Sequence, residues 1–120
     1  MSRIVVVEDN EDMRSLLVMT LQIEGFEVAG AANGTGALEE LARRPADLIV
    51  TDLFMPDKDG IETIEEIRRK HPQTKIVAMS GWQSLQGPDY LDVAREIGAV
   101  GTLRKPFDPA ELVAVVRKVL

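Results

Sequence analysis

Three carboxylates, one hydroxyl and one ammonium group have the chemical types and the spacing needed to handle a phosphoryl group. Glu8 and Asp9 directly follow one short apolar run, and Asp52 follows another. Ser80 and Lys105 stand at the ends of two further runs. Carboxylates held close together repel one another, and a hard divalent cation removes that conflict. Mg2+ prefers one or two carboxylates together with a phosphate, so this set suits an acyl phosphate formed on a carboxylate.

The elements between these residues predict how positions far apart in the chain could meet. Apolar runs and segments of helical periodicity alternate, and the expected strands are 4–7, 26–31, 48–51, 75–79 and 100–103. Runs that are apolar without alternation indicate strands buried on both faces, as in a parallel sheet. Right-handed crossovers place helices on both faces. We therefore expect residues 1–120 to form one doubly wound α/β domain, with its functional crevice at the carboxyl ends of the strands.

Composition and charge limit the classes of function. The 120 residues fit one domain, and a net charge of −6 opposes non-specific binding to nucleic acid. There is no cysteine and one histidine, which excludes disulfides, thiol catalysis and histidine-rich metal sites. No apolar stretch approaches the roughly 20 residues of a membrane span, and the N-terminal residues do not form a signal peptide. We expect a cytoplasmic protein without membrane insertion.

Four segments carry a family resemblance: VVVEDN, TDLFMPDKDG, IVAMSG and LRKPF. In this order and spacing they resemble the receiver domains of bacterial two-component response regulators, and the resemblance covers nearly the whole chain. Each segment alone is weakly specific, but the four together in one strand-helix frame are highly specific. The resemblance implies a flavodoxin-like (βα)5 fold with strand order 2-1-3-4-5. It also implies a phosphoacceptor switch that promotes only its own phosphorylation and dephosphorylation, rather than an enzyme.

The same resemblance implies a role for each polar residue. Asp52 would accept the phosphoryl group from a sensor histidine kinase or a phosphotransfer protein. Asp9 and Asp52 would bind Mg2+, for which Mn2+ could substitute. Glu8 would act mostly through bound water, and the backbone carbonyl of Phe54 would be a further metal ligand.

Ser80 and Lys105 would each bind a phosphoryl oxygen, and a cis peptide bond between Lys105 and Pro106 is implied as well. The fourth helix, fifth strand and fifth helix would form the output face, which could also form a homodimer. The downstream target is not identified by the sequence.

Two features depart from the usual receiver pattern. Many receivers carry an aromatic residue on the fifth strand, and the alignment from Lys105 places Thr102 there. Ser80 is retained, so the loop after the fourth strand could carry more of the signal, with Trp82 as an apolar contact for a partner. Phe54 and Trp82 also flank the expected path of a hydrolytic water, so we expect their rings to prolong the phosphorylated state.

Several alternative functions compete with this interpretation. An aspartyl phosphatase needs an acid two residues after its nucleophile, where Phe54 stands, and the glycine-rich motif of a P-loop enzyme is absent. In a flavodoxin-like cofactor protein, Glu8 and Asp9 would repel a cofactor phosphate. A pseudo-receiver would not need the intact set of site residues. The chain could be the receiver fragment of a regulator with a DNA-binding or enzymatic output domain. Its initiating Met and its end at the last helix favour a stand-alone receiver.

Each site residue taken alone also has an ordinary structural explanation. Asp9 could cap the first helix, Asp52 could begin a loop, and Lys105 could simply be solvated. All these explanations would have to hold independently, which favours the functional interpretation.

Overall fold

The computed structural model describes residues 1–54, 60–81 and 89–120, in which strands and helices alternate along the chain. The strands of this part are β1 (Arg3–Val7), β2 (Glu27–Ala31), β3 (Leu48–Asp52), β4 (Lys75–Ser80) and β5 (Gly101–Arg104). Its helices are α1 (Glu11–Ile23), α2 (Gly34–Arg43), α3 (Gly60–Lys70), α4 (Tyr90–Glu96) and α5 (Pro109–Val119). The expected alternation is confirmed, and several strand ends differ from the expected bounds by one residue.

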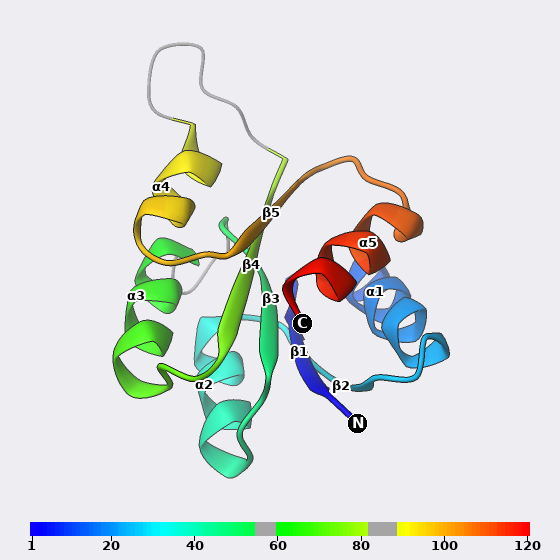
Figure 1. Cartoon of the computed structure of the whole chain (residues 1–120), viewed down its shortest axis with the longest axis horizontal. Helices are drawn as coiled ribbons and strands as arrows, with labels where there is room; N and C mark the ends of the chain where they lie inside the picture. Colours follow the sequence, from blue (N-terminus) through cyan, green and yellow to red (C-terminus); the bar gives the residue numbers. More distant parts are fainter. Residues whose placement is uncertain (55–59, 82–88) are drawn as a thin grey trace.

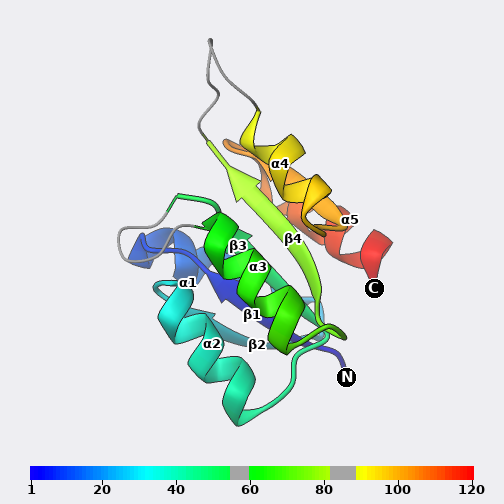
Figure 2. The ribbon, with the colours of Figure 1, turned by 90° about the vertical axis from the view of Figure 1, so that its left-hand side faces the viewer.

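The strands form one parallel sheet with the order β2-β1-β3-β4-β5, which confirms the expected topology. Figure 1 shows α1 and α5 on one face of the sheet and α2, α3 and α4 on the other. The turned view in Figure 2 shows α2 and α3 lying across the second face. The doubly wound arrangement follows from strands that are buried on both sides.

Two apolar layers hold the helices against the sheet. Successive residues of a strand point to opposite faces, so each central strand contributes to both layers. Val5 and Val7 of β1 join the layer beneath α2, α3 and α4, whereas Ile4 and Val6 join the layer beneath α1 and α5. This double burial explains why the central runs of the sequence are continuously apolar.

Local sequence fixes where the helices begin. Four helices follow an Asn or Asp whose side-chain oxygen accepts a backbone N–H of the first turn, namely Asn10, Asn33, Asp89 and Asp108. Gly25, just beyond α1, has a φ of 96°, a conformation that favours glycine at a helix end. These residues place the start of each of the four helices at the carboxyl edge of the sheet.

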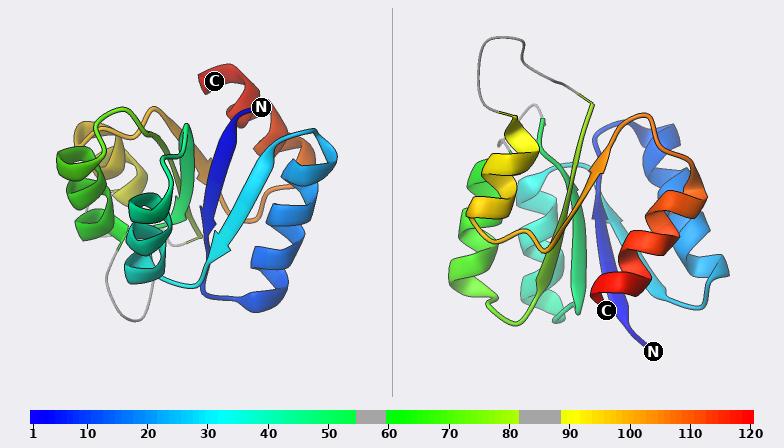
Figure 3. Two further views of the ribbon diagram at one scale, coloured as in Figure 1. Left: turned by 90° about the horizontal axis from the view of Figure 1, so that it is seen from below. Right: turned by 45° about the horizontal axis from the view of Figure 1, so that its top comes forward.

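A cluster of charges lies at the opposite edge, around the buried side chain of Arg3. Its guanidinium donates to the backbone carbonyl of Arg44 at 2.7 Å and to the Glu40 carboxylate at 3.0 Å. We name this group the amino-end cluster, and its three basic and three acidic members are Arg3, Arg43, Arg44, Glu27, Glu40 and Asp47. Both chain termini lie at this end of the sheet (Figure 3).

Candidate functional site

The pairing of β1 with β3 brings three carboxylates together at the carboxyl edge. Val7 of β1 pairs with Thr51 of β3, so the residues that follow each of them lie side by side. Glu8, Asp9 and Asp52 each place a carboxylate oxygen within 4.8 Å of the others. We name these three residues the acidic triad. Their convergence is the arrangement that the sequence predicted from the strand ends.

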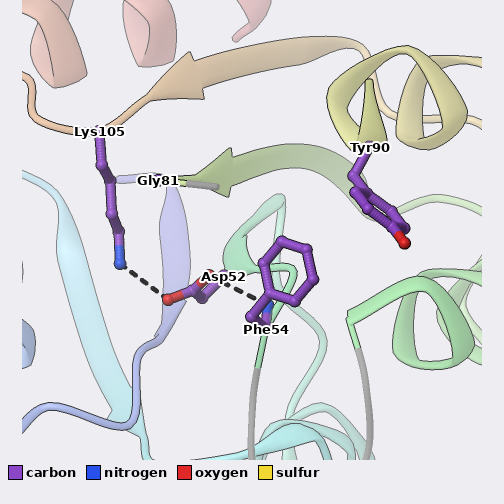
Figure 4. Close-up of a pocket in the computed structure, with 5 residues that line it drawn as sticks. All are labelled: Asp52, Phe54, Gly81, Tyr90 and Lys105. Carbon is purple, nitrogen blue, oxygen red and sulfur yellow. Dashed lines mark hydrogen bonds and ion pairs between the residues drawn. The ribbon is translucent and has the colours of Figure 1, made fainter. Parts of the chain in front are cut away.

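Lys105 reaches into the acidic triad from the end of β5. Its ammonium lies 2.5 Å from Glu8 Oε1 and 2.7 Å from Asp52 Oδ2, and Figure 4 shows the contact with Asp52. The Lys105 amide donates to the Ser80 carbonyl at 2.9 Å, which fixes the chain just beyond β5 against the end of β4. The Lys105–Pro106 peptide bond is cis.

The site contains three carboxylates and one ammonium group, and two of the carboxylates are almost completely buried. Glu8 is 1% exposed and Asp52 is 6% exposed. Burial raises the pKa of Glu8, and Asp9 and the Asp52 charge raise it further, against the opposing effect of Lys105. Burial lowers the pKa of Lys105, but its hydrogen bonds with Asp52 and Glu8 outweigh burial, so that pKa is raised overall.

The donor set of the acidic triad fits a hard divalent cation. Lys105 supplies one positive charge against three carboxylates, and the triad offers only oxygen donors at close range. Oxygen ligands and an excess of negative charge are what Mg2+ requires. A lysine ion pair alone leaves this charge only partly compensated.

Asp9 is not the cap of α1. The side chain of Asn10 accepts the Met13 amide at 2.8 Å and begins the helix. Asp9 is exposed and belongs to the acidic triad instead. The ordinary explanation of Asp9 as a helix cap is therefore wrong, because the next residue fills that role.

The segment after Asp52 is held close to the site. The Phe54 amide donates to Asp52 Oδ1 at 3.1 Å. Gly60 at the start of α3 donates to the Leu53 carbonyl at 2.8 Å, and a Cβ on Gly60 would lie 2.3 Å from Leu53 Cα. A residue without a side chain is needed for this close approach, which holds the chain after Asp52 against α3.

Phe54 contacts an aromatic residue that the sequence did not single out. Its ring lies 5.1 Å from the ring of Tyr90, at an interplanar angle of 80°, in an edge-to-face arrangement. Figure 4 shows Lys105 and Phe54 on opposite sides of Asp52, with Tyr90 extending from α4 towards Phe54. Tyr90 gave no signal in the sequence, because the contact joins two segments that only the packing of the fold brings together.

Two hollows share Asp52 and Lys105 in their walls. One of about 500 Å3 is lined in addition by Phe54, Gly81 and Tyr90. The other, of about 550 Å3, is lined by the rest of the acidic triad and by α1, through Glu8, Asp9, Asn10, Asp12, Met13 and Leu16. A ligand can therefore approach the largely buried Asp52 carboxylate.

The remaining residues of interest lie close to these hollows or outside the described part. Ser80 ends β4 and is fully buried. Thr102 lies on β5, where its hydroxyl accepts a hydrogen bond from Arg95 of α4 at 2.6 Å. Trp82 falls outside the described residues. Across 1–54, 60–81 and 89–120, no helix is both long enough and apolar enough to cross a membrane.

Comparisons with known proteins point to one family. The family model of the response regulator receiver domain matches residues 4–117. The whole chain is 35% identical to the response regulator receiver protein CpdR of Brucella abortus (strain 2308), of which it covers 98%. It is 38% identical to the transcriptional regulatory protein CpxR of Escherichia coli (strain K12), again over the whole chain but over 50% of CpxR. The chain thus spans nearly all of one relative and half of the other.

A solved structure extends this similarity to three dimensions. The response regulator protein TrrA from Thermotoga maritima, in complex with Mg2+-BeF, is similar with a TM-score of 0.86 and 34% identity. The match covers 100% of both chains. At this level of identity and coverage, the similarity concerns the sequence as well as the fold.

Proposed function

The chain belongs to the response regulator receiver domain family, and we propose that Asp52 is its phosphoacceptor, taking a phosphoryl group from a phosphohistidine. The observation that carries this proposal is the setting of the Asp52 carboxylate. It ends β3 within 2.7 Å of Lys105 and belongs to the acidic triad. The donor would be a sensor histidine kinase or a phosphotransfer protein.

The acidic triad would hold Mg2+, with Mn2+ as a plausible substitute. Asp9 and Asp52 would be direct ligands, Glu8 would act mostly through water, and the Phe54 carbonyl would complete the protein ligands. The bound cation would neutralise charge on the transferring phosphoryl group. The complex of TrrA with Mg2+-BeF supports this expectation for the family fold.

Each site residue would have its own role in the phosphoryl transfer. A carboxylate oxygen of Asp52 forms the new bond to phosphorus, and the bond from phosphorus to the donor imidazole nitrogen breaks, its electron pair returning to the ring. The Phe54 amide holds the other carboxylate oxygen. Lys105 and Ser80 would each bind a phosphoryl oxygen, so that catalysis consists of positioning and charge neutralisation.

An intact-mass measurement tests the acceptor. With Mg2+ and acetyl phosphate, the wild type should gain the mass of one phosphoryl group and Asp52→Asn should not. Asp108→Asn is a matched control, because it removes a carboxylate away from the site and keeps a good helix cap. Equal labelling of Asp52→Asn and wild type would refute the assignment.

The phosphorylated state should be long-lived. Phe54 is 41% exposed, and its ring packs against Tyr90 beside the hollow that contains Asp52. A phenyl ring can neither activate nor orient a water. Phe54→Asn should therefore speed the loss of phosphate from Asp52, as measured by the decay of the phosphorylated mass. The same shielding effect is predicted for Trp82, which lies outside the described residues.

For output, we propose contact with a protein partner through α4, β5 and α5, the face that could also form a homodimer. Thr102 and Arg95 connect β5 with α4 on this face.

The relation to CpdR over nearly its whole length supports a stand-alone receiver. The relation to half of CpxR supports the alternative, a receiver that controls a DNA-binding or enzymatic output domain. Light scattering with and without beryllofluoride would test the homodimer, which requires a larger mass in the activated state.

A further inference from the structure

The cap of α4 and the first residue of the helix each contact a residue that flanks the proposed phosphoryl site. Asp89, the cap of α4, pairs with Arg104 at 2.5 Å, and Arg104 directly precedes Lys105. Tyr90 contacts the Phe54 ring, and the Phe54 amide donates to Asp52. The start of α4 is therefore attached to both sides of the site.

We propose that Tyr90 is a positioning residue, which holds Phe54 against Asp52 and thereby couples the position of α4 to the state of the phosphoacceptor. This inference rests on the proposed function of Asp52. A phosphoryl group on Asp52 changes the acceptor that the Phe54 amide binds. A shift of Phe54 changes its edge-to-face contact with Tyr90, and Tyr90 begins α4.

Because α4 is short, its contact with the Phe54 ring is important for its position. The helix has 7 residues, of which Leu91 and Ala94 are buried. Short helices depend on tertiary contacts for their stability, and few buried apolar contacts mark an element that opens easily. A change at Tyr90 therefore acts on a short element whose described amino end is held by this ring contact, the Asp89–Arg104 pair and the buried Leu91.

The opposite end of α4 is tied to β5 rather than to the phosphoryl site. Arg95 donates to the Thr102 hydroxyl at 2.6 Å and also pairs with Asp92 at 2.7 Å. Thr102 stands where many receivers have an aromatic residue, so a ring on β5 is not available to follow Ser80. The aromatic contact to α4 comes instead from Phe54, on the other side of Asp52.

Coupling of this kind is reciprocal, because a binding free energy that moves α4 is also felt at the site. Removing the Tyr90 ring should therefore change the affinity of the site for beryllofluoride. It should also change the lifetime of phosphorylated Asp52, because it releases the Phe54 ring that lies beside the hollow of Asp52. An edge-to-face pair of this type corresponds to a change of about two- to tenfold in an equilibrium. A partner bound to α4 would alter the same affinity through Tyr90.

Backbone amide NMR with beryllofluoride and Mg2+ tests the proposal, using Tyr90→Leu and Tyr90→Phe. In the wild type, amides of the site and of residues 91–96 should both shift. In Tyr90→Leu, the site amides should still shift, while the shifts of residues 91–96 should fall to less than half. Tyr90→Phe keeps the ring and should restore the wild-type response.

A double-mutant cycle with Phe54→Leu gives a second measurement that a purely structural role would not change. The effects of Phe54→Leu and Tyr90→Leu on the decay rate of phosphorylated Asp52 should be strongly non-additive. If Tyr90→Leu fails to fold, Phe54→Leu alone removes the same ring contact and should lose the same shifts.

The outcomes separate this inference from the proposed function. If beryllofluoride leaves every wild-type amide unchanged, the proposed function itself fails. If the site responds but α4 of Tyr90→Leu or Phe54→Leu shifts as in the wild type, the proposed function stands and the coupling is wrong. Additive effects on decay, or no rescue by Tyr90→Phe, would also overturn the coupling.

Discussion

The amino and carboxyl edges of the sheet differ in how completely their charged side chains are compensated by one another. At the amino end, three arginines meet three acidic residues, and Arg3 contacts carboxylates and a carbonyl at once. At the carboxyl end, two of the three carboxylates of the acidic triad, those of Glu8 and Asp52, share the Lys105 ammonium. The first arrangement is complete within the chain, whereas the second becomes balanced only when a further positive charge arrives. The contrast distinguishes a cluster whose charges are balanced by its own side chains from one whose excess negative charge suits the cation proposed above.

Because some of these charges are buried, the difference in compensation should affect the stability of the protein. Removing one partner of a buried ion pair leaves a charge that neither water nor protein compensates. Among the described residues, no buried side-chain nitrogen or oxygen lacks a hydrogen-bond partner. The imbalance at the carboxyl end is therefore one of net charge and not of missing hydrogen bonds.

The largest effect is expected from breaking the amino-end cluster. Arg3→Met should lower the free energy of unfolding by about 3 kcal/mol, because it removes the buried guanidinium that donates to the Arg44 carbonyl and leaves Glu40 with only the exposed Arg43 as a partner. Urea unfolding measures the change, and added Mg2+ should not restore it. Arg43→Met, an exposed member of the same cluster, should cost less than about 1 kcal/mol. Equal costs for both variants would show that Arg3 is not the centre of the cluster.

The next largest loss of stability is expected at the carboxyl edge, where the negative charge of the acidic triad is only partly compensated. Lys105→Met should lower the free energy of unfolding by about 2 kcal/mol in the presence of a chelator, and Mg2+ should restore most of this loss. The reason is that Lys105 and a cation would compensate the same carboxylates, Glu8 and Asp52. Lys70→Met, which removes an exposed lysine paired with Glu66, is the control and should show no special response to Mg2+. A loss that Mg2+ leaves unchanged would contradict the comparison of the two ends.

Metal affinity provides a smaller and more specific effect. Asp9→Ala should weaken Mg2+ binding at least about tenfold, because it removes one oxygen donor from the acidic triad. Isothermal titration or a fluorescence titration would measure the affinity. Asp12→Ala is matched in type and lines the same hollow but lies outside the triad, so it should bind Mg2+ nearly as the wild type does. Similar losses in both variants would mean that general negative charge, and not the triad, binds the cation.

The smallest effect is a difference between two glutamates in metal-free protein. Burial raises the pKa of Glu8 above its ordinary value of 4.5, and the hydrogen bond from Arg44 lowers the pKa of Glu27 below it. Glu27 therefore stabilises the fold above its unfolded pKa, and this contribution is lost as the pH falls through its lowered pKa. Glu8 has the opposite sign, because stability is gained as the pH falls through its raised pKa.

Carboxyl carbon NMR shifts recorded against pH in a chelator would resolve the two glutamates. Glu27 should titrate at a lower pH than Glu8. Arg44→Met should move the titration of Glu27 upward and leave that of Glu8 unchanged. Titration of both residues at the same pH would remove the electrostatic contrast between the two ends.

Much of the fold followed from periodicity alone. The continuous apolar runs predicted a parallel sheet, and its order was implied by the family resemblance of the four quoted segments. The meeting of Glu8, Asp9 and Asp52 was predictable because all three stand at strand ends, where a parallel sheet gathers them. These features depend on patterns that repeat along one element.

The features that the sequence did not predict are contacts between single side chains of different elements. Asn10 and not Asp9 caps α1, although both residue types suit that position. Arg3 reads as a charged residue at the edge of an apolar run, and its acidic partners come from separate segments. The contact of Tyr90 with Phe54 likewise depends on where α4 lies above the sheet. Such contacts are set by tertiary packing and leave no periodic pattern.

The strict alternation of strand and helix also orients the peptide dipoles of the whole domain. Each helix starts near the carboxyl edge of the sheet and runs back towards the amino edge. A helix carries a partial positive charge at its amino end and a partial negative charge at its carboxyl end. The positive ends of the helices thus lie on the side of the acidic triad, and the basic last turns, such as Arg68, Arg69 and Lys70 of α3, face the other way. The backbone itself therefore contributes a field that favours a phosphoryl group at Asp52 before any side chain moves.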